Sequence, residues 1–167
     1  MLDWTIQDWG AAGELVGAFA VILSLLYVGF QVKLNTAERR ADTIQAITHV
    51  NAELALVIVN NQDVSIAWHK VLEQEELTKR EVDIMSDLLY AHLMLLEDTY
   101  SKYRQGYVAS DVLDAKVALH TLAIQRSPQL VEVYSRMKLE KIYTLPFVSW
   151  LDHTLRTQGF LASESPE

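Results

Sequence analysis

The residues Leu15–Val32 form an unbroken apolar run, LVGAFAVILSLLYVGFQV, in which only Ser24 and Gln31 are clearly polar. The hydrocarbon core of a bilayer is ~30 Å thick and needs about 20 residues of helix to cross it. Neighbouring residues on either side supply the missing length. We therefore predict a transmembrane helix over residues 11–33, preceded by a short outer segment at 1–10.

Three other interpretations of this run are less favoured. A cleaved signal peptide has a basic start and a small-residue cleavage site, but the first 32 residues contain no Lys or Arg. A buried helix of a soluble protein is less favoured because this run is apolar on nearly every side for five turns, more than a chain of this size is expected to enclose. An amphipathic helix lying on a membrane needs a broad charged face, which is absent here.

The charges flanking the run predict its orientation. The leading side is acidic and the trailing side basic: Asp3, Asp8 and Glu14 come before it, and Lys33, Arg39 and Arg40 after it. Basic residues are retained in the cytoplasm, so the N-terminus is expected outside and the rest of the chain inside. Trp4 and Trp9 suit the outer interface, where an indole ring meets lipid and its N–H meets water, although ordinary packing explains them too.

Small and polar residues recur seven apart along the predicted transmembrane helix. Two neighbouring rows make up this stripe, which we call the seam: Gly10, Gly17, Ser24 and Gln31, with Gly13, Ala20 and Tyr27. Bulky residues occupy the opposite side: Leu15, Phe19, Ile22, Leu26 and Phe30. Helices associate in lipid where small residues let backbones approach, and a seven-residue repeat keeps the stripe on a partner helix.

The seam predicts self-association or packing on a partner helix. The simpler alternative is that Gly and Ser are common in membrane helices and have no such role here. A further alternative is that a ring of subunits places Ser24 and Gln31 on a water-filled pore. The run contains neither a selectivity-filter motif nor charge deep in the membrane, so a pore is the second choice.

The remaining residues predict an all-α domain at 34–160. Half of the 167 residues are hydrophobic, and 6 Gly and 3 Pro are too few for a turn-rich β fold. Because no Pro or Gly lies between Phe30 and Asn60, the transmembrane helix is expected to continue to Asn60. Four residues at helical spacing mark the inner side of this extension: Ile44, Ile47, Leu54 and Ile58.

Helix start and stop signals divide the rest of this domain. Asp63 is a candidate cap for a short helix carrying Ile66, Trp68 and Val71, and Thr78–Glu81 is a capping-box sequence. The helix that follows is expected to end at Gly106, with its apolar middle, residues 88–96, at the centre of an antiparallel bundle or, less favoured, as a second membrane span. Further helices begin at Ser110, at Ser127–Pro128 and at Thr144, the last ending before Gly159. The tail, 161–167, is expected to be disordered.

The composition and the spacing of the histidines argue against several classes of function. With no cysteine, the chain can form neither a disulfide nor a thiolate-ligated metal site. The net charge of -8 disfavours nucleic-acid binding, because an acidic surface repels phosphates. A di-iron carboxylate site needs Glu three residues before His, and none of the five histidines has an acidic residue there.

No catalytic, cofactor or metal site is predicted. The chain lacks a phosphate-binding glycine loop, Gly-x-Ser-x-Gly and His-Glu-x-x-His. His49 with Glu53 and His69 with Glu73 are interpreted as surface pairs. His92, on the apolar helix, is the best candidate for a buried, perturbed histidine, although a core histidine hydrogen-bonded to a tyrosine or a carbonyl is the more ordinary interpretation. Glu97–Asp98 and the tyrosines at 100, 103 and 107 are interpreted as structural.

The run from Gly13 to Ala46 resembles the start of a family of short, poorly characterised bacterial membrane proteins. The matching features are an acidic residue, a Gly/Ala-rich apolar helix, a Tyr and Gln-x-Lys-x-Asn-Thr: Glu14, Gly17, Ala18, Tyr27, Gln31, Lys33, Asn35 and Thr36. Residues 95–108 and Ser127–Pro128 are similar to later features of the family. The chain departs from the family pattern by having fewer Trp and Arg residues in its second half. The resemblance implies a membrane-anchored helical protein and brings no activity with it.

These observations predict a protein of the bacterial inner membrane that is not an enzyme and binds no cofactor. Its expected contacts are membrane lipid, further copies of itself through the transmembrane helix, and a possible protein partner. A scaffold or regulatory role is the first prediction, and a ring-forming channel or transport component is the alternative.

Overall fold

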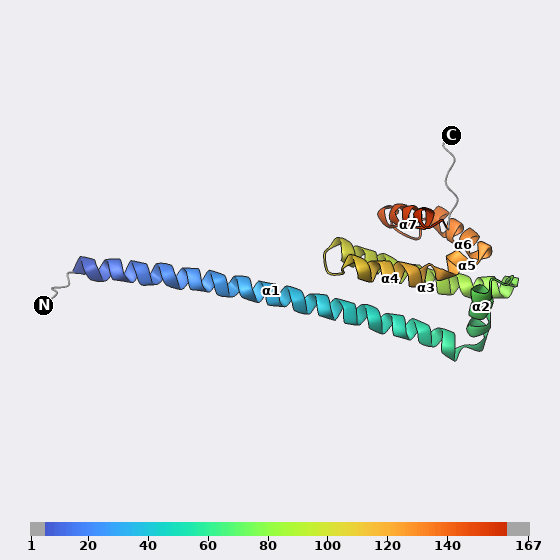
Figure 1. Ribbon diagram of the computed structural model, residues 1–167, viewed down its shortest axis with the longest axis horizontal. Helices are drawn as coiled ribbons and strands as arrows, with labels where there is room; N and C mark the ends of the chain where they lie inside the picture. The colour runs from blue at the N-terminus through green and yellow to red at the C-terminus, as the bar shows by residue number, and fades with distance from the viewer. Residues whose placement is uncertain (1–5, 160–167) are drawn as a thin grey trace, which may run out of the picture. The chain divides into compact units, whose positions relative to one another are not determined.

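The computed structural model describes residues 6–159, so residues 1–5 of the predicted outer segment and the predicted disordered tail 161–167 lie outside it. The described residues form helices joined by short turns and contain no strand. The helices, in chain order (Figure 1), are α1 (Ile6–Asn60), α2 (Gln62–Glu73), α3 (Lys79–Arg104), α4 (Ser110–His120), α5 (Leu122–Arg126), α6 (Pro128–Leu139) and α7 (Leu145–Thr157). The chain divides after Asp42 into two compact units, and we describe each by itself.

Helix α1 confirms that the apolar run continues as helix to Asn60. In the second unit, Ile47 of α1 is 5% exposed, and Leu54 and Ile58 pack against the core. The prediction for Ile44 was wrong, because this side chain is 41% exposed. Three residues turn a helix by about 300°, which places Ile44 roughly 60° away from Ile47, on the side farther from Leu54.

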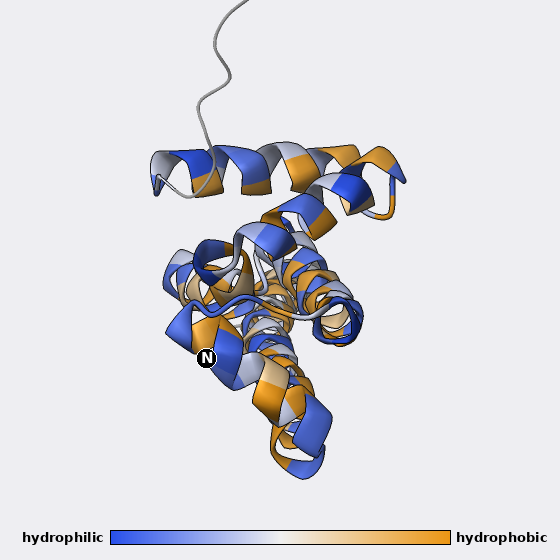
Figure 2. Ribbon diagram, turned by 90° about the vertical axis from the view of Figure 1, so that its right-hand side faces the viewer, coloured by the Kyte–Doolittle hydropathy of each residue, from blue (hydrophilic) through white to orange (hydrophobic). Residues whose placement is uncertain are grey.

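Helix α3 is the central element of the second unit, as its apolar middle predicted. Leu89, Leu93 and Leu96 are at most 1% exposed, within a core shared by α2 to α7. The other side of this stretch is open, since Tyr90 is 40% and Met94 50% exposed. The helices of this unit carry both hydrophobic and hydrophilic residues (Figure 2), as core-facing helices do.

Local signals define most of the helix ends. At the start of α3 the Thr78 hydroxyl accepts from Glu81 N–H while the Glu81 carboxylate accepts from Thr78 N–H, which confirms the capping box. Gly106, just beyond α3, has φ +79°, a conformation that favours glycine. The cap of α2 is Asn61 rather than Asp63, because the Asn61 side chain accepts from the N–H groups of Asp63 and Val64.

A short additional helix, α5, lies between the predicted starts at Ser110 and Ser127. Thr121 separates it from α4 and is fully buried. The Thr121 hydroxyl donates to the Val117 carbonyl at 2.7 Å and accepts from the Gln125 side chain at 2.7 Å. A buried threonine that bonds the preceding turn bends a helix, which accounts for the division.

Candidate functional site

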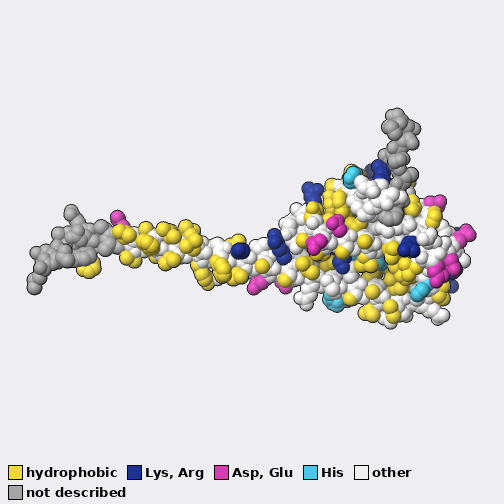
Figure 3. All heavy atoms as spheres, viewed as in Figure 1, with side chains coloured by type: hydrophobic (Ala, Val, Ile, Leu, Met, Phe, Trp, Pro, Cys, Tyr) yellow, Lys and Arg dark blue, Asp and Glu magenta, His cyan; other side chains and the backbone are white. Residues whose placement is uncertain are grey.

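The apolar segment of α1 is uncovered within its own unit. Twelve large apolar side chains between Leu15 and Val32 are 53–70% exposed. On the visible face of Figure 3, hydrophobic side chains cover this part of α1 between an acidic and a basic residue. Soluble monomers rarely expose contiguous apolar patches beyond a few hundred Å², so this segment needs a covering that the monomer does not provide.

Within residues 6–159, one helix is long and apolar enough to cross a membrane, and it is the N-terminal one. None of its most apolar 18-residue window is buried. The core helix of a soluble protein would be mostly buried, so this finding weighs against the buried-helix alternative. Helix α3 does not meet the same test, which leaves the second-span alternative without support.

All seven seam residues lie on α1 and are exposed: Gly10, Gly13, Gly17, Ala20, Ser24, Tyr27 and Gln31. Successive members of each row fall about 20° short of two full turns, so each row remains on one side over this length. A Cβ added at any of the three seam glycines would meet nothing within 4 Å. The glycines are therefore not needed for packing within the unit.

One hydrogen bond links two of the seam residues. The Gln31 side-chain amide donates to the Tyr27 hydroxyl at 2.7 Å across one helical turn. This pairing reduces the cost of placing two polar groups in an apolar surrounding, since each partly satisfies the other. It leaves Gln31 with one amide proton and a carbonyl that can bond across a helix interface.

A buried histidine pair lies in the second unit, well separated in sequence from the seam. His92 of α3, singled out from the sequence, is 7% exposed, and its Nδ1 lies 2.9 Å from Nδ1 of His120 on α4. Trp68 stacks on His92 with ring planes 5° apart. Sequence reasoning missed His120, because its own helix gives no sign of burial. The partner it expected for His92, a tyrosine or a carbonyl, was wrong.

Burial keeps both histidines of this pair neutral. Burial lowers the pKa of His92 to about 4. Burial is also the largest cause that lowers the pKa of His120, to about 3, followed by electrostatic repulsion from His92 and Lys116. Perturbed groups of this kind mark functional sites as well as structural pairs. Among the described residues, no carboxylate contributes to the pKa shift of either histidine, which favours the structural interpretation.

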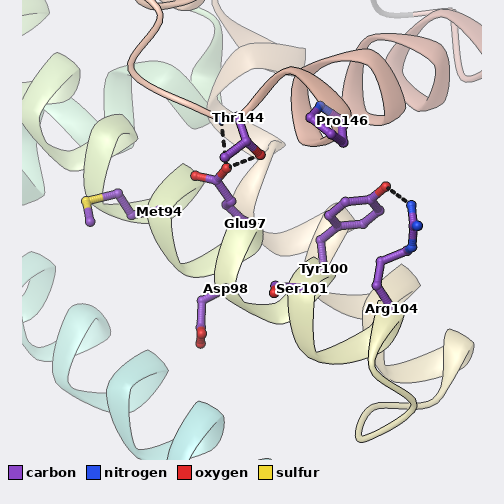
Figure 4. A pocket seen from close by; sticks show the side chains of 8 residues that line it. All are labelled: Met94, Glu97, Asp98, Tyr100, Ser101, Arg104, Thr144 and Pro146. Carbon is purple, nitrogen blue, oxygen red and sulfur yellow. Dashed lines mark hydrogen bonds between the residues drawn. The ribbon is translucent and has the colours of Figure 1, made fainter.

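An open groove of about 490 Å³ runs along α3 beside the start of α7 (Figure 4). The Glu97 carboxylate turns towards Thr144 and accepts from its N–H at 2.8 Å and its hydroxyl at 2.6 Å. Arg104 donates to the Tyr100 hydroxyl at 3.3 Å. Because these polar groups are paired with one another, the groove presents few free groups to a ligand.

The other polar residues considered from the sequence are dispersed. His49 and Glu53 lie 3.7 Å apart on an exposed face, His69 Nδ1 contacts the Ser65 carbonyl, and Asp98 pairs with Lys102. Over the described residues, no three His, Asp or Glu side chains gather closely enough to hold a metal ion. The seam and its apolar surroundings are therefore the best candidate for a functional surface.

Comparisons with protein-family models, with curated proteins and with solved structures found no match to this chain.

Proposed function

We propose that this chain is a single-pass protein of the bacterial inner membrane, with its N-terminus outside and residues 34–160 forming an antiparallel helical bundle in the cytoplasm. In this proposal it has no enzymatic activity and acts as a homo-oligomeric scaffold or regulatory protein. The observation that carries the proposal is the apolar run of α1, none of which is buried. Apolar side chains are stable in contact with lipid, whereas exposing them to water is unfavourable.

The charge distribution supports the proposed orientation. Glu14 precedes the apolar run, and Lys33 is the first basic residue of the chain, followed by Arg39 and Arg40. In this orientation the three basic residues meet the negatively charged cytoplasmic leaflet. Cysteine placed at residue 3 should react with a membrane-impermeant thiol reagent on intact spheroplasts, whereas cysteine at residue 75 should react only after lysis. The opposite pattern would overturn the orientation.

The seam supports self-association through α1. We expect the double change Gly13→Leu and Gly17→Leu to dissociate the assembly in mild detergent, because leucine keeps the backbones apart. Gly29→Leu is a matched control, since this glycine also has nothing within 4 Å of its added Cβ and lies off the seam. Light scattering coupled to size-exclusion chromatography measures the mass. An unchanged mass in the double variant would count against the seam.

Two further measurements address the alternative classes of function. In liposomes carrying the purified protein, a scaffold should produce no ion flux, whereas a ring-forming channel lined by Ser24 and Gln31 should conduct. Elemental analysis of the purified protein should find no stoichiometric metal. A bound metal would reopen the enzyme class.

A further inference from the structure

The turn between α6 and α7 exposes large apolar side chains more fully than the apolar run of α1 does. Leu139 is 83% exposed and Leu145 75%, against 53–70% for the large apolar side chains of Leu15–Val32. Ile142, between them, is 39% exposed. We refer to Leu139, Ile142 and Leu145 together as the apolar corner.

The apolar corner is held in place by its own backbone. At the end of α6, Ile142 N–H donates to the Met137 carbonyl at 3.3 Å and Lys141 N–H to the Lys138 carbonyl at 3.1 Å. Lys141 itself has φ +56°. These three features define a Schellman motif, which closes a helix in a fixed geometry. The exposed leucines therefore follow from an ordered turn.

Two residues between Ile142 and Leu145 attach the corner to α3. Tyr143 is 5% exposed, and its hydroxyl donates to the Tyr90 carbonyl at 3.3 Å. Glu97 accepts from both the N–H and the hydroxyl of Thr144. Since Tyr143 and Thr144 are both fixed to α3, Ile142 and Leu145 on either side of them cannot turn into the core without breaking these bonds.

Two exposed basic side chains, Arg136 and Lys141, lie in the corner segment of a chain whose net charge is -8. Their acidic neighbours are Glu140 and Glu97, and the Glu97 carboxylate is bonded to Thr144. Lys138 forms an ion pair with Asp152, with 2.9 Å between Nζ and Oδ2. Exposed leucines next to Arg and Lys suit the interface of an anionic bilayer, where apolar tips enter the acyl boundary and basic groups meet headgroup phosphates.

The size of the corner argues against a protein partner. Three side chains offer a few hundred Å² at most, far below the ~800 Å² per partner of a standard protein interface. A bilayer needs no matching groove and accepts protruding side chains individually.

Only ten residues separate Val32, at the end of the apolar run, from Thr43, the first residue of the second unit. On the proposed function, the membrane surface is then within reach of this unit.

We propose that the apolar corner is a second membrane contact, at which Leu139, Ile142 and Leu145 enter the interface of the anionic leaflet and Arg136 and Lys141 bind its headgroups. This inference rests on the proposed membrane anchor. The contact would hold the second unit against the bilayer in one orientation, which an anchoring helix alone does not do.

Depth-dependent quenching tests this contact in the full-length protein. The chain has no cysteine, so single cysteines introduced at 139, 145, 75 and 23 can each carry one fluorophore. The carriers are nanodiscs of an equimolar mixture of phosphatidylcholine and phosphatidylglycerol containing a spin-labelled lipid. We expect quenching at 139 and 145 in these nanodiscs and no quenching at 75, an exposed loop position of the same unit.

The label at residue 23 separates this inference from the proposed function. Quenching at 23 without quenching at 139 or 145 would overturn the corner contact alone, and absence of quenching at 23 would overturn both proposals. Labels at 139 and 145 that are shielded from aqueous iodide yet not quenched by lipid would reveal a protein occupant and also overturn it.

Two changes test the chemistry of the contact. With the label at 139, Leu145→Gln should lower the ratio of docked to undocked protein about tenfold, because one buried leucine is lost. Lys141→Gln should lower it about fivefold in the anionic nanodiscs. A matched change distant from the corner, Glu75→Gln, should leave the ratio unchanged. Equal quenching in pure phosphatidylcholine nanodiscs would overturn the role given to Arg136 and Lys141.

Discussion

His92 and His120 share a hydrogen bond of 2.9 Å between their Nδ1 atoms, inside the core of the second unit. One imidazole donates and the other accepts, so the accepting ring must be neutral. Among the described residues, the Nε2 atom of each ring is buried without a hydrogen-bond partner. A proton added to either ring would therefore place a poorly compensated charge beside Trp68 and Lys116.

The stability of the second unit should fall as the pH falls below about 6.5. In the folded state the pKa values are about 4 for His92 and about 3 for His120, whereas an unfolded histidine has about 6.5. Below about pH 6.5 the unfolded chain therefore binds protons that the folded chain does not bind. The stabilisation is complete above pH 6.5 and is lost as the pH falls through 4, by up to about 1.4 kcal/mol per pH unit for each histidine.

Denaturant unfolding followed by circular dichroism between pH 7.5 and 4 measures this loss. Carboxylates also titrate near the lower limit, so the useful quantity is the difference from the double variant His92→Leu/His120→Leu, which should show a flatter profile. His153→Gln, a change at an exposed histidine, should retain the wild-type profile. Identical slopes in the double variant and the wild type would contradict the prediction.

Removing one histidine should cost more than removing both. His120→Leu leaves Nδ1 of His92 buried without its partner, at a cost of about 1–3 kcal/mol at neutral pH. The double change replaces both polar groups by apolar ones of similar size and should be nearly neutral. A double-mutant cycle at pH 7.5 measures the coupling, and simple additivity of the two single changes would show that the bond contributes nothing.

Thr78→Ala should destabilise the second unit by about 1 kcal/mol, because it removes the side-chain acceptor at the N-cap of α3. Thr78→Ser retains the hydroxyl and should restore most of this loss. Thermal unfolding of the two variants makes the comparison. If Ser and Ala behave alike, the loss belongs to the threonine methyl group rather than to the cap.

The link between α6 and α7 should depend on Asp152 more than on Tyr134. The Asp152 carboxylate accepts from the Tyr134 hydroxyl at 2.8 Å and pairs with Lys138 at 2.9 Å. Tyr134→Phe removes one bond and should cost about 1 kcal/mol, whereas Asp152→Leu leaves two donors without an acceptor and should cost more. Urea unfolding ranks the two variants, and the reverse order would contradict this arrangement.

The same carboxylate helps to raise the pKa of Tyr134 above its ordinary value of 10. Burial is the largest cause, followed by the charge of Asp152. Burial also raises the pKa of Tyr143. Spectrophotometric titration to high pH should therefore detect fewer ionising tyrosines in the folded protein than in the denatured one. Ionisation of all seven tyrosines near pH 10 would contradict the burial of these two side chains.

Local sequence signals were sufficient for most helix boundaries and for the apolar segment. The capping box at Thr78, the glycine at 106 and Pro128 act within one or two turns, so their effect can be read without knowing the fold. The apolar run of α1 is also a property of a single helix. Its helical form and its exposure agree with the sequence, while its place in a membrane remains a prediction.

Contacts between helices could not be read in this way. His120 lies on a short helix without a marked apolar side, and only the packing of α4 on α3 brings it to His92. The apolar corner could not be recognised from the sequence either, because Leu139 and Leu145 have the apolar character of core residues. In the structure Tyr143 and Phe147 occupy the buried positions instead. The amino-acid sequence determines periodicity and helix ends, which depend on neighbours along the chain. Which apolar residues remain exposed, and which polar ones meet, depends on neighbours in space.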